Sequence, residues 1–487
     1  MIHYIHCHQT YDMNKGGTVG YVSSLMKSMI QSGSFTSKKN ILHSFIIPDS
    51  NINIDNYIYK ELKDNQFSEV YEYQKNSKLK IITDRKKWFY SILPLNEFIK
   101  INPQQIKSIH INGAYNFLPI YNSLKVLGIH HKTIKLLTTH NPWKPEIEDM
   151  ELITRNINWS EVNKEHLKYF FNKRDYYAFS LADAYLFPTE ESMEGYYRYW
   201  PDFKKIIKGK KIYFVPTGTE KKVVHTDKYR IKKNLGIPEN AFVFLFLGRF
   251  VNVRGYDIYI EAAKKILKQY NNIYFISVGE SKNTPSIEHP YWKEIPFTKC
   301  PGDFINMADA CIVPNRGSFF DLSMIEILSL GKILICADVG GYKWLKNKTD
   351  GVLYFQSENI EELVNQIINF TQLNVHDVEI LQANNESFYK KVLDIKYFSY
   401  NYKDVIDRMY DDFNIENVYN KEFNNINIQY SSDSRLIPLK DYTISIDEQS
   451  PQKHYYEKYK PNYIRKLNKL KRNPKLFFID MIQKYLH

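Results

Sequence analysis

The chain has 487 residues, of which 43% are hydrophobic, 15% aromatic and 25% charged, and its formal net charge at pH 7 is +12. This aromatic content excludes a chain that is disordered throughout, because the rings can bury a large apolar surface, and the length predicts two or three domains. The positive charge indicates an anionic partner, which composition leaves open between nucleic acid, a membrane surface and a phosphorylated small molecule.

The N-terminal part of the chain predicts strands and helices in alternation. Short apolar strands are expected at 2–7, 41–47, 109–111, 134–139, 184–188 and 212–216, and helices at 19–30 and 175–181. Strands that alternate with helices form a parallel sheet with helices on both faces. We therefore expect an α/β domain here.

The same alternation continues in the second part. Strands are expected at 242–248, 273–279, 310–314 and 333–337, and helices at 256–270, 303–307, 323–330 and 361–370. The pattern changes after about residue 424. We place an N-terminal domain at 1–215, a second α/β domain at 216–400, a helical return toward the first domain at 401–423, and a polar linker with a basic tail at 424–487.

The cysteines and the lengths of the apolar runs indicate in which compartment the protein is expected. The four cysteines, Cys7, Cys300, Cys311 and Cys336, form no CxxC pair and no close cluster. This pattern indicates neither a zinc site nor a disulfide scaffold, and free thiols fit a reducing cytoplasm. The first residues do not read as a signal peptide, and the apolar runs are too short for a membrane span. We expect a cytoplasmic protein, either soluble or peripheral on a membrane.

A glycine-rich loop follows the first predicted strand. Gly16 and Gly17 lie within the segment from Asn14 to Gly20, directly before a helix. Glycine lets the backbone approach a ligand, and a helix N-terminus offers free N–H groups to an anion. The spacing is not that of the GxGxxG dinucleotide fingerprint. A plain tight turn explains these residues as well as a phosphate site does.

Two arginines follow the strand expected at 242–248. Arg249 and Arg254 stand at its carboxyl end, where ligands bind in open α/β sheets. Arginine suits phosphate because its planar fork donates two parallel hydrogen bonds. The alternative is a pair of solvated loop arginines.

A glutamate stands in the first turn of the helix expected at 323–330. We expect Glu326 to face the strand-end cleft, where its carboxylate could accept hydrogen bonds from two vicinal hydroxyls, as on a ribose. A glutamate in a first turn also complements the helix dipole without any ligand.

Together these residues resemble the donor half of family 4 retaining glycosyltransferases of the GT-B fold. The resemblance rests on Gly248-Arg249 with Arg254-Gly255, and on Pro314 through Gly331 followed by Gly340-Gly341. It extends over roughly residues 1–410, with further matches at 14–20, 139–141, 182–183 and 216–218. It implies an α/β chain with two Rossmann-like, doubly wound domains facing a cleft, plus a basic C-terminal extension.

The resemblance also implies catalytic roles for matching residues. Arg249 and Arg254 would hold the diphosphate of the donor, although the second position is usually lysine. Glu326 would bind the ribose, and His140 would lie near the reacting sugar. The implied substrate-binding residues are Gly16, Gly17, Asn141, Ser318, Phe320, Asp321, Leu322 and Ser323.

One position departs from the family pattern. Ser318 stands where the family carries the first glutamate of a pair, so the usual carboxylate contact to the transferred sugar is missing. Asp321 stands where glycine is common and is a candidate substitute. The departure also supports a second hypothesis, a non-catalytic GT-B subunit that binds a partner transferase or a glycan. A sugar-nucleotide epimerase is a third.

The implied activity is hexosyl transfer with retention, without a metal or other cofactor. The donor would be a nucleoside diphosphate sugar, whose leaving group gains negative charge that fixed arginines and helix N-termini stabilise. The acceptor would be a growing bacterial surface glycan, such as capsule, O-antigen or lipopolysaccharide, that is lipid-linked or close to the membrane.

The last residues hold much of the net charge. Residues 453–487 contain ten lysines and arginines against two acids, a net charge of +8. Ile464, Leu467 and Leu470 recur at helical spacing among these cations. Such a segment suits an anionic membrane, which would place the protein on the cytoplasmic face of the inner membrane. Docking on the N-terminal domain and a solvated tail remain alternatives. Because the charge is concentrated here, we expect no nucleic-acid partner.

Overall fold

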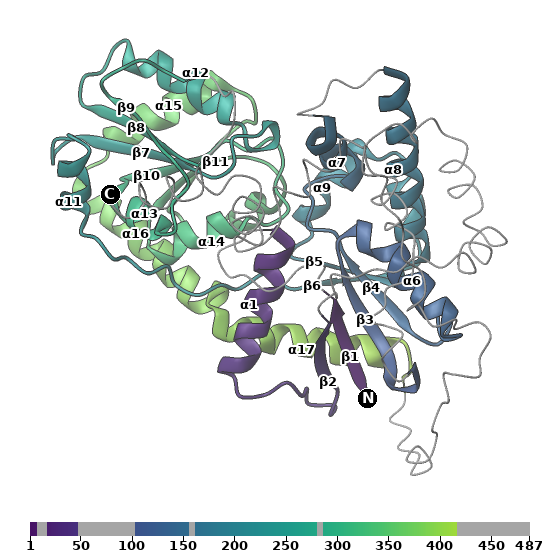
Figure 1. The fold of residues 1–487 in the computed structure, drawn as a ribbon. Coiled ribbons are helices and arrows are strands. Elements are labelled where there is room, and N and C mark those ends of the chain that lie inside the picture. The colour runs from purple at the N-terminus through teal and green to yellow at the C-terminus, as the bar shows by residue number, and fades with distance from the viewer. Residues whose placement is uncertain (7–16, 47–102, 155–160, 280–285, 416–487) are drawn as a thin grey trace, which may run out of the picture.

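The computed structural model describes residues 1–6, 17–46, 103–154, 161–279 and 286–415, which form two α/β domains side by side (Figure 1). The predicted basic tail and Gly16 lie outside these residues. None of the described helices combines the length and the apolar character that a membrane crossing requires.

Within the described residues, the N-terminal domain is built on a sheet of six parallel strands. Across the sheet these are β2 (Leu42–Ile46), β1 (Ile2–His6), β3 (Ile106–Asn112), β4 (Ile134–Thr138), β5 (Ala184–Phe187) and β6 (Lys211–Phe214). The first helix of the domain, α1 (Gly17–Gln31), connects β1 to β2. The remaining elements are η2 (Pro103–Gln105), η3 (Ala114–Asn116), α6 (Phe117–Val126), α7 (Pro145–Thr154), α8 (Glu161–Leu181), η4 (Glu191–Met193), α9 (Glu194–Tyr199) and α10 (Phe203–Ile206).

Two hydrophobic cores cover the two faces of this sheet. Successive residues of a strand point to opposite faces, so Tyr4 and Ile5 of β1 enter different cores. Tyr4 packs in a cluster with residues of α6 and α8. Ile5 packs in a cluster with residues of α1 and of α17 (Ile395–Asp412). Helices therefore cover both faces, as the alternation of strands and helices predicted.

The second domain repeats this design. Its sheet, within the described residues, has the parallel order β12 (Val352–Phe355), β11 (Ile333–Ala337), β10 (Ala310–Val313), β7 (Phe242–Leu247), β8 (Ile273–Val278) and β9 (Trp292–Ile295). Its other elements are α11 (Lys228–Asn234), η5 (Asn252–Arg254), α12 (Tyr256–Leu267), α13 (Pro301–Met307), α14 (Leu322–Ser329), η6 (Gly340–Leu345), α15 (Ile360–Thr371), α16 (Val375–Phe388) and η7 (Tyr389–Leu393). Two Rossmann-like domains, as expected, make up the described chain.

The strand order locates the natural ligand position in each domain. In the second sheet the order runs outward in both directions from the neighbouring strands β7 and β10. Open α/β sheets bind ligands at such a switch point, beyond the carboxyl ends of the strands. The loops after β7 and β10 are the loops that carry Arg249, Arg254 and Ser318.

The helix α17 connects the second domain back to the first (Figure 1). It begins at Ile395, earlier than the helical return expected at 401–423, because Asp394 caps it by accepting a hydrogen bond from the Lys396 amide at 3.0 Å. Its buried face, which includes Tyr402 and Tyr410, packs in the same core as α1.

A buried polar network fixes α17 over β1 and β3. The Tyr402 hydroxyl lies 2.9 Å from Nε2 of His3 and 2.8 Å from Nδ1 of His110. The Ser108 hydroxyl lies 2.6 Å from Nδ1 of His3 and 2.7 Å from the Tyr410 hydroxyl. Buried polar groups are costly unless paired, so these bonds specify one position of α17 on the sheet.

This network should make the fold sensitive to acid. Burial lowers the pKa of His3 and His110 well below the ordinary value, and that of His43 to about 4. A histidine whose pKa is lower in the folded state than in the unfolded state binds a proton more readily when the chain is unfolded. The free energy of unfolding therefore falls as the pH drops below the unfolded pKa. We expect each of the three to remove up to about 1.4 kcal/mol of unfolding free energy per pH unit below about pH 6.5.

Urea unfolding of the full chain at neutral pH and in mild acid checks this expectation. His43→Gln should reduce the loss, whereas His376→Gln should leave it unchanged, because His376 is exposed on α16. A stability that is constant or rises as the pH falls from neutral would contradict the expectation.

Candidate active site

The loops after β7 and β10 touch each other at a glycine. Gly255 has φ +64°, and a Cβ added there would overlap the carbonyl oxygen of Pro314. Only glycine tolerates both this backbone conformation and this close approach. Gly255 thus holds the loop with Arg249 and Arg254 against the start of the loop that leads to Ser318.

Arg254 and Asp321 form the central ion pair of this site. Nη1 of Arg254 lies 2.8 Å from Oδ1 of Asp321, and both side chains are largely buried. Burial opposes the charge of Arg254, but the Asp321 carboxylate outweighs it and the pKa of the guanidinium is raised. The cation is therefore held in one place before any ligand arrives.

The second carboxylate oxygen of Asp321 is also occupied. It accepts hydrogen bonds from Asn315 Nδ2 at 3.0 Å, from the Ser318 hydroxyl at 3.1 Å and from the Tyr342 hydroxyl. Asp321 therefore positions Arg254 and the loop around it. Asn315, which lies within the motif at 314–331, and Tyr342 were not among the predicted site residues.

Glu326 lies on α14 and forms an ion pair with the linker between the domains. Its Oε1 lies 2.7 Å from Nζ of Lys222, and the backbone N–H of Lys222 donates to the Ser329 hydroxyl at 3.2 Å. Burial raises the pKa of Glu326, and Lys222 acts in the opposite direction. Lys222 was not predicted, although it follows the motif at 216–218 by a few residues.

His140 follows β4 in the opposite domain and has an unusual backbone. Its φ is +64°, a conformation that is uncommon for residues other than glycine. Its Nε2 lies 2.8 Å from Oδ1 of Asn112. Its ring packs against Tyr21 at 4.7 Å and against Phe319 of the second domain at 5.8 Å between centroids. His140 is thus placed where the two domains meet.

Glu148 of α7 connects Asn141 to Arg249. Asn141 Nδ2 donates to its Oε2 at 2.7 Å, and Arg249 Nη2 lies 3.4 Å from its Oε1. The Arg249 side chain is 57% exposed, so this ion pair is weak and leaves the guanidinium accessible to a ligand. Glu148, like Lys222, was not among the predicted site residues.

The remaining predicted residues are divided between the site and the core. Gly17 begins α1 with φ +64°, and Ser323 lies in the first turn of α14. Phe320 is buried with its ring 5.5 Å from Trp344, and Leu322 packs against the same core. The side chains of Phe320 and Leu322 therefore stabilise the second domain, and only their backbone can face a ligand.

The loop after β10 and the helix η6 after β11 both contact the N-terminal domain. The Ser192 hydroxyl donates to the carbonyl oxygen of Phe319. Glu194 of α9 accepts from the Gly340 amide at 2.6 Å and from Lys343 Nζ at 2.7 Å. A Cβ added at Gly317 would lie 2.7 Å from the Trp143 ring. The absence of a side chain at Gly317 thus allows the two domains to approach closely, whereas Gly340 makes room for the Ser318 backbone within the second domain.

Gly317→Ala should therefore impair turnover without unfolding either domain. The added methyl group would meet the Trp143 ring at 2.7 Å and hold the domains apart. A displacement of about 1 Å between reacting groups costs about 10²-fold in rate, so we expect a loss of that order in kcat with a thermal midpoint close to that of the parent chain. Adding Trp143→Phe removes the contacted ring atoms and should restore turnover. Full activity of Gly317→Ala would show that this contact is not needed.

The described residues contain no group of three or more His, Cys, Asp or Glu side chains arranged to hold a metal ion. Cys311 and Cys336 are buried, and burial raises the pKa of each thiol. Thiols of this kind are unreactive. Metal independence stays a prediction.

Comparison with known proteins places part of the candidate site within a region that matches a described family. Residues 241–372, which include Arg249, Arg254 and Glu326, match the family described as Glycosyl transferases group 1. The chain is 26% identical over 193 residues to the UDP-Gal:alpha-D-GlcNAc-diphosphoundecaprenol alpha-1,3-galactosyltransferase of Escherichia coli, a match that covers 36% of this chain and 49% of that protein. The chain spans half or less of the length of the curated relatives it matches.

Solved structures share the two-domain architecture. Sucrose-phosphate synthase from Thermosynechococcus elongatus superposes with a TM-score of 0.56 at 14% identity, over 84% of this chain and 99% of that chain. HepE of Anabaena in complex with UDP-glucose superposes with a TM-score of 0.52 at 13% identity, over 84% and 100% of the two chains. At these identities the likeness shows the fold alone, and it confirms the expected arrangement of two Rossmann-like domains.

Proposed function

We propose that the chain is a retaining glycosyltransferase, because residues 241–372 match the family described as Glycosyl transferases group 1. It transfers a sugar from a nucleoside diphosphate sugar to a growing bacterial surface glycan. The observation that supports this proposal is that Arg254, which follows β7, and Glu326, on the helix that follows β10, are each held by an ion pair. Both are fixed by partners, Asp321 and Lys222, before the donor binds.

The cations stabilise the leaving group. As the bond between the sugar and the diphosphate breaks, negative charge builds on the diphosphate oxygens. Arg254 is already oriented by Asp321, and Arg249 is exposed beside it. Preorganised charges of this kind lower the barrier most where they need not move during the reaction. The free N–H groups at the start of α14 add to the positive field.

Glu326 holds the donor in register with these cations. An ionised carboxylate accepts two hydrogen bonds from the vicinal hydroxyls of a ribose, and Lys222 favours the ionised form. The ribose therefore anchors the diphosphate against Arg249 and Arg254, and the sugar extends toward His140. This positioning reduces the entropy lost when the reacting groups meet.

Retention follows when the acceptor hydroxyl attacks the face from which the diphosphate departs. The hydroxyl proton then passes to the departing phosphate oxygen, and the new bond takes the configuration of the old one. His140, held by Asn112 and by the Tyr21 and Phe319 rings, shapes the space for the sugar. Since the arginines and α14 supply positive charge, this route needs no metal.

A lipid-linked acceptor is supported by the relative from Escherichia coli, whose name specifies a sugar on diphosphoundecaprenol. The basic segment 453–487, which lies outside the described residues, would bring the enzyme to the anionic cytoplasmic face of the inner membrane. One variant tests both proposals. Deletion of 453–487 should release the protein from anionic vesicles, and it should weaken the use of a lipid-linked acceptor.

A panel of nucleotide sugars tests the activity itself. The full chain is incubated with each nucleotide sugar, and both the thermal midpoint and the release of nucleoside diphosphate are measured. Binding to the native state raises the midpoint, so at least one donor should stabilise the chain and be turned over. If no nucleotide sugar in the panel does either, the proposal is wrong.

A non-catalytic subunit is the second candidate, and one observation favours it. Both oxygens of Asp321 are occupied by Arg254, Asn315, Ser318 and Tyr342. Asp321 is therefore poorly placed to replace the carboxylate missing at Ser318. Absence of nucleoside diphosphate binding in calorimetry would favour this candidate.

A further inference from the structure

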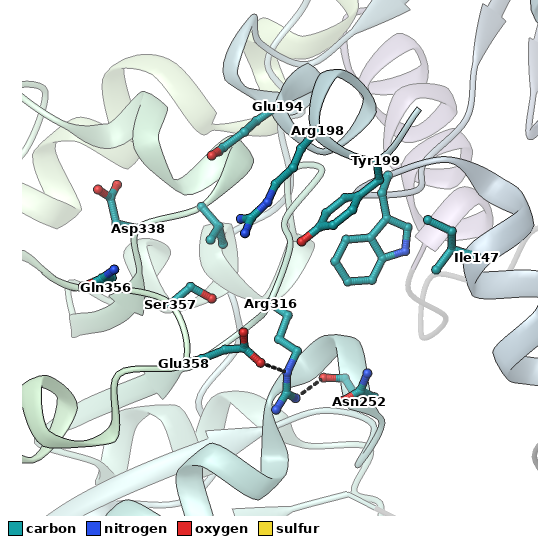
Figure 2. Close-up of a pocket in the computed structure, with 12 residues that line it drawn as sticks. Ile147, Glu194, Arg198, Tyr199, Asn252, Arg316, Asp338, Gln356, Ser357 and Glu358 are labelled. Atoms are coloured by element: carbon teal, nitrogen blue, oxygen red, sulfur yellow. Dashed lines mark hydrogen bonds and ion pairs between the residues drawn. The ribbon is translucent and has the colours of Figure 1, made fainter. Parts of the chain in front are cut away.

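A cavity of about 600 Å³ lies between the two domains, outside the set of predicted donor-binding side chains (Figure 2). One wall comes from α7 and α9 of the N-terminal domain, and the other from the loops after β7, β10, β11 and β12. Interfaces between domains are frequent positions for ligand sites, and this volume is ample for a small ligand. Nothing in the proposed donor chemistry uses this space.

Arg316 holds the segment after β12, which forms one wall of the cavity, in a fixed position. Its Nε donates to Glu358 at 2.8 Å, and it forms two further bonds to the Asp257 carboxylate at 2.7 and 2.9 Å. Figure 2 shows Arg316 between Glu358 and Asn252, whose carbonyl oxygen it contacts at 2.8 Å. Glu358 has φ +66°, a strained conformation that surrounding bonds must maintain. Arg316 therefore shapes the cavity, and its charge is neutralised.

Arg198 is different, because its charge is not neutralised. Figure 2 shows its guanidinium pointing from α9 into the cavity. Its guanidinium carbon lies 5.2 Å from the centroid of the Tyr199 ring, and within the part of the chain that the structure describes no carboxylate pairs with it.

Each carboxylate that lines the cavity already forms an ion pair with a lysine or an arginine. Glu194 pairs with Lys343 at 2.7 Å, Asp338 with Lys346 at 2.7 Å, and Glu358 with Arg316 at 2.8 Å. Arg198 is therefore the one cation lining the cavity, within the described residues, that has no carboxylate partner, and it can pair with an anionic group of a ligand.

The remaining walls suit a ring with many hydroxyls. The rings of Trp143 and Tyr199 meet edge to face at 5.6 Å and present apolar surface to the cavity. The side chains of Gln356 and Ser357 line the opposite wall, and within the described residues neither is used in a hydrogen bond. An amide and a hydroxyl donate to and accept from sugar hydroxyls, while the C–H face of a pyranose packs on an aromatic ring.

We propose that this cavity binds a saccharide unit that carries a carboxylate or a phosphate, as part of the acceptor glycan. The proposal rests on the proposed function, since it names a feature of the acceptor. Arg198 pairs with the anionic group, Tyr199 packs against the ring, and Gln356 and Ser357 bond its hydroxyls. Arg316 belongs to the same loop as Ser318, so a saccharide here lies next to the donor site.

Three matched probes test this proposal by calorimetry on the full chain. They are maltotetraose, maltotetraose oxidised to a uronic acid at its terminal C6, and maltotetraose carrying a phosphate at that C6. A charge-assisted pair with Arg198 should make at least one anionic probe bind about 10-fold more tightly than the neutral one. The tighter of the two anionic probes identifies the carboxylate or the phosphate as the natural group.

Matched variants assign the binding to the cavity. Arg198→Gln should abolish the preference for the anionic probe, and Tyr199→Ala should weaken all the probes that bind. Arg230→Gln removes the same charge from an exposed position on α11 and should keep the preference. Equal affinity for neutral and anionic probes, absence of binding by all three, or a preference that survives Arg198→Gln would overturn the proposal. Titration of UDP and GDP on the same samples tests the donor site separately, so failure of one proposal is distinguished from failure of the other.

Discussion

Replacing Arg254 with glutamine should lower kcat/KM for sugar transfer by about 10²–10³-fold, the loss expected when one preorganised group that stabilises transition-state charge is removed. Arg254 is held by Asp321 at 2.8 Å at the carboxyl end of β7, so the cation is fixed before the donor arrives. Glutamine keeps a donor group but has no charge for the departing diphosphate. Steady-state kinetics with saturating acceptor measure the effect.

A second variant separates chemistry from folding. Arg254→Gln leaves the Asp321 carboxylate buried without its cation, which should cost about 3–5 kcal/mol of unfolding free energy. Combining it with Asp321→Asn removes that unpaired charge, so stability should recover while turnover stays low. A double variant that transfers sugar at the parental rate would show that Arg254 does not stabilise the leaving group.

Replacing Glu326 with glutamine should weaken donor use by about 10²-fold, because hydrogen bonds to a charged acceptor contribute about 1.5–3 kcal/mol. The effect should be largest in KM for the donor, since the ribose hydroxyls are bound in the ground state and in the transition state alike. Binding of the nucleoside diphosphate, measured by calorimetry, should fall in parallel.

Replacing both Glu326 and Lys222 with neutral residues should not lower the free energy of unfolding. Burial raises the pKa of Glu326, so this carboxyl stabilises the fold below its unfolded pKa and loses that contribution as the pH rises through the folded pKa. At neutral pH the ionised group is therefore a cost to folding, which Lys222 partly offsets. Glu326→Gln with Lys222→Met should leave stability equal or raised by about 1–4 kcal/mol. A large loss of stability would show that the pair is structural.

Donor binding should also depend on pH through Glu326. Binding should be constant at high pH and weaken as the pH falls through the raised pKa, because the protonated carboxyl accepts fewer hydrogen bonds from the ribose. Lys222→Met removes the cation that opposes the shift, so the weakening should begin at higher pH. An unchanged pH profile in this variant would contradict the role given to Lys222.

The fold was predictable where strands are apolar and end at glycine or proline. The strand expected at 242–248 is β7, and the strand expected at 310–314 is β10, which ends before Pro314. The strand β9 was not predicted, because Lys293 and Glu294 interrupt it at the edge of the sheet. The helix α17 was placed too late, because its start depends on the Asp394 cap and its buried face on tyrosines.

The charged residues of the candidate site could be named from the sequence, but only some of their partners could. Arg254 and Glu326 were candidates because of their positions after two predicted strands and because of the family resemblance, and their roles in donor binding stay predictions. The partner of Arg254, Asp321, was already a candidate. The partner of Glu326, Lys222, was not, because it lies 2.7 Å from Glu326 only where the linker passes α14 in the fold. Phe320 shows the reverse case, because it belongs to the motif and yet its ring is in the core.

A crystal structure of the full chain with UDP or GDP tests the donor site most directly. The phosphates should contact Arg249 and Arg254, and the ribose hydroxyls should bond the Glu326 carboxylate. A nucleotide bound elsewhere, for example beside Arg198 in the cavity between the domains, would contradict the proposed donor site.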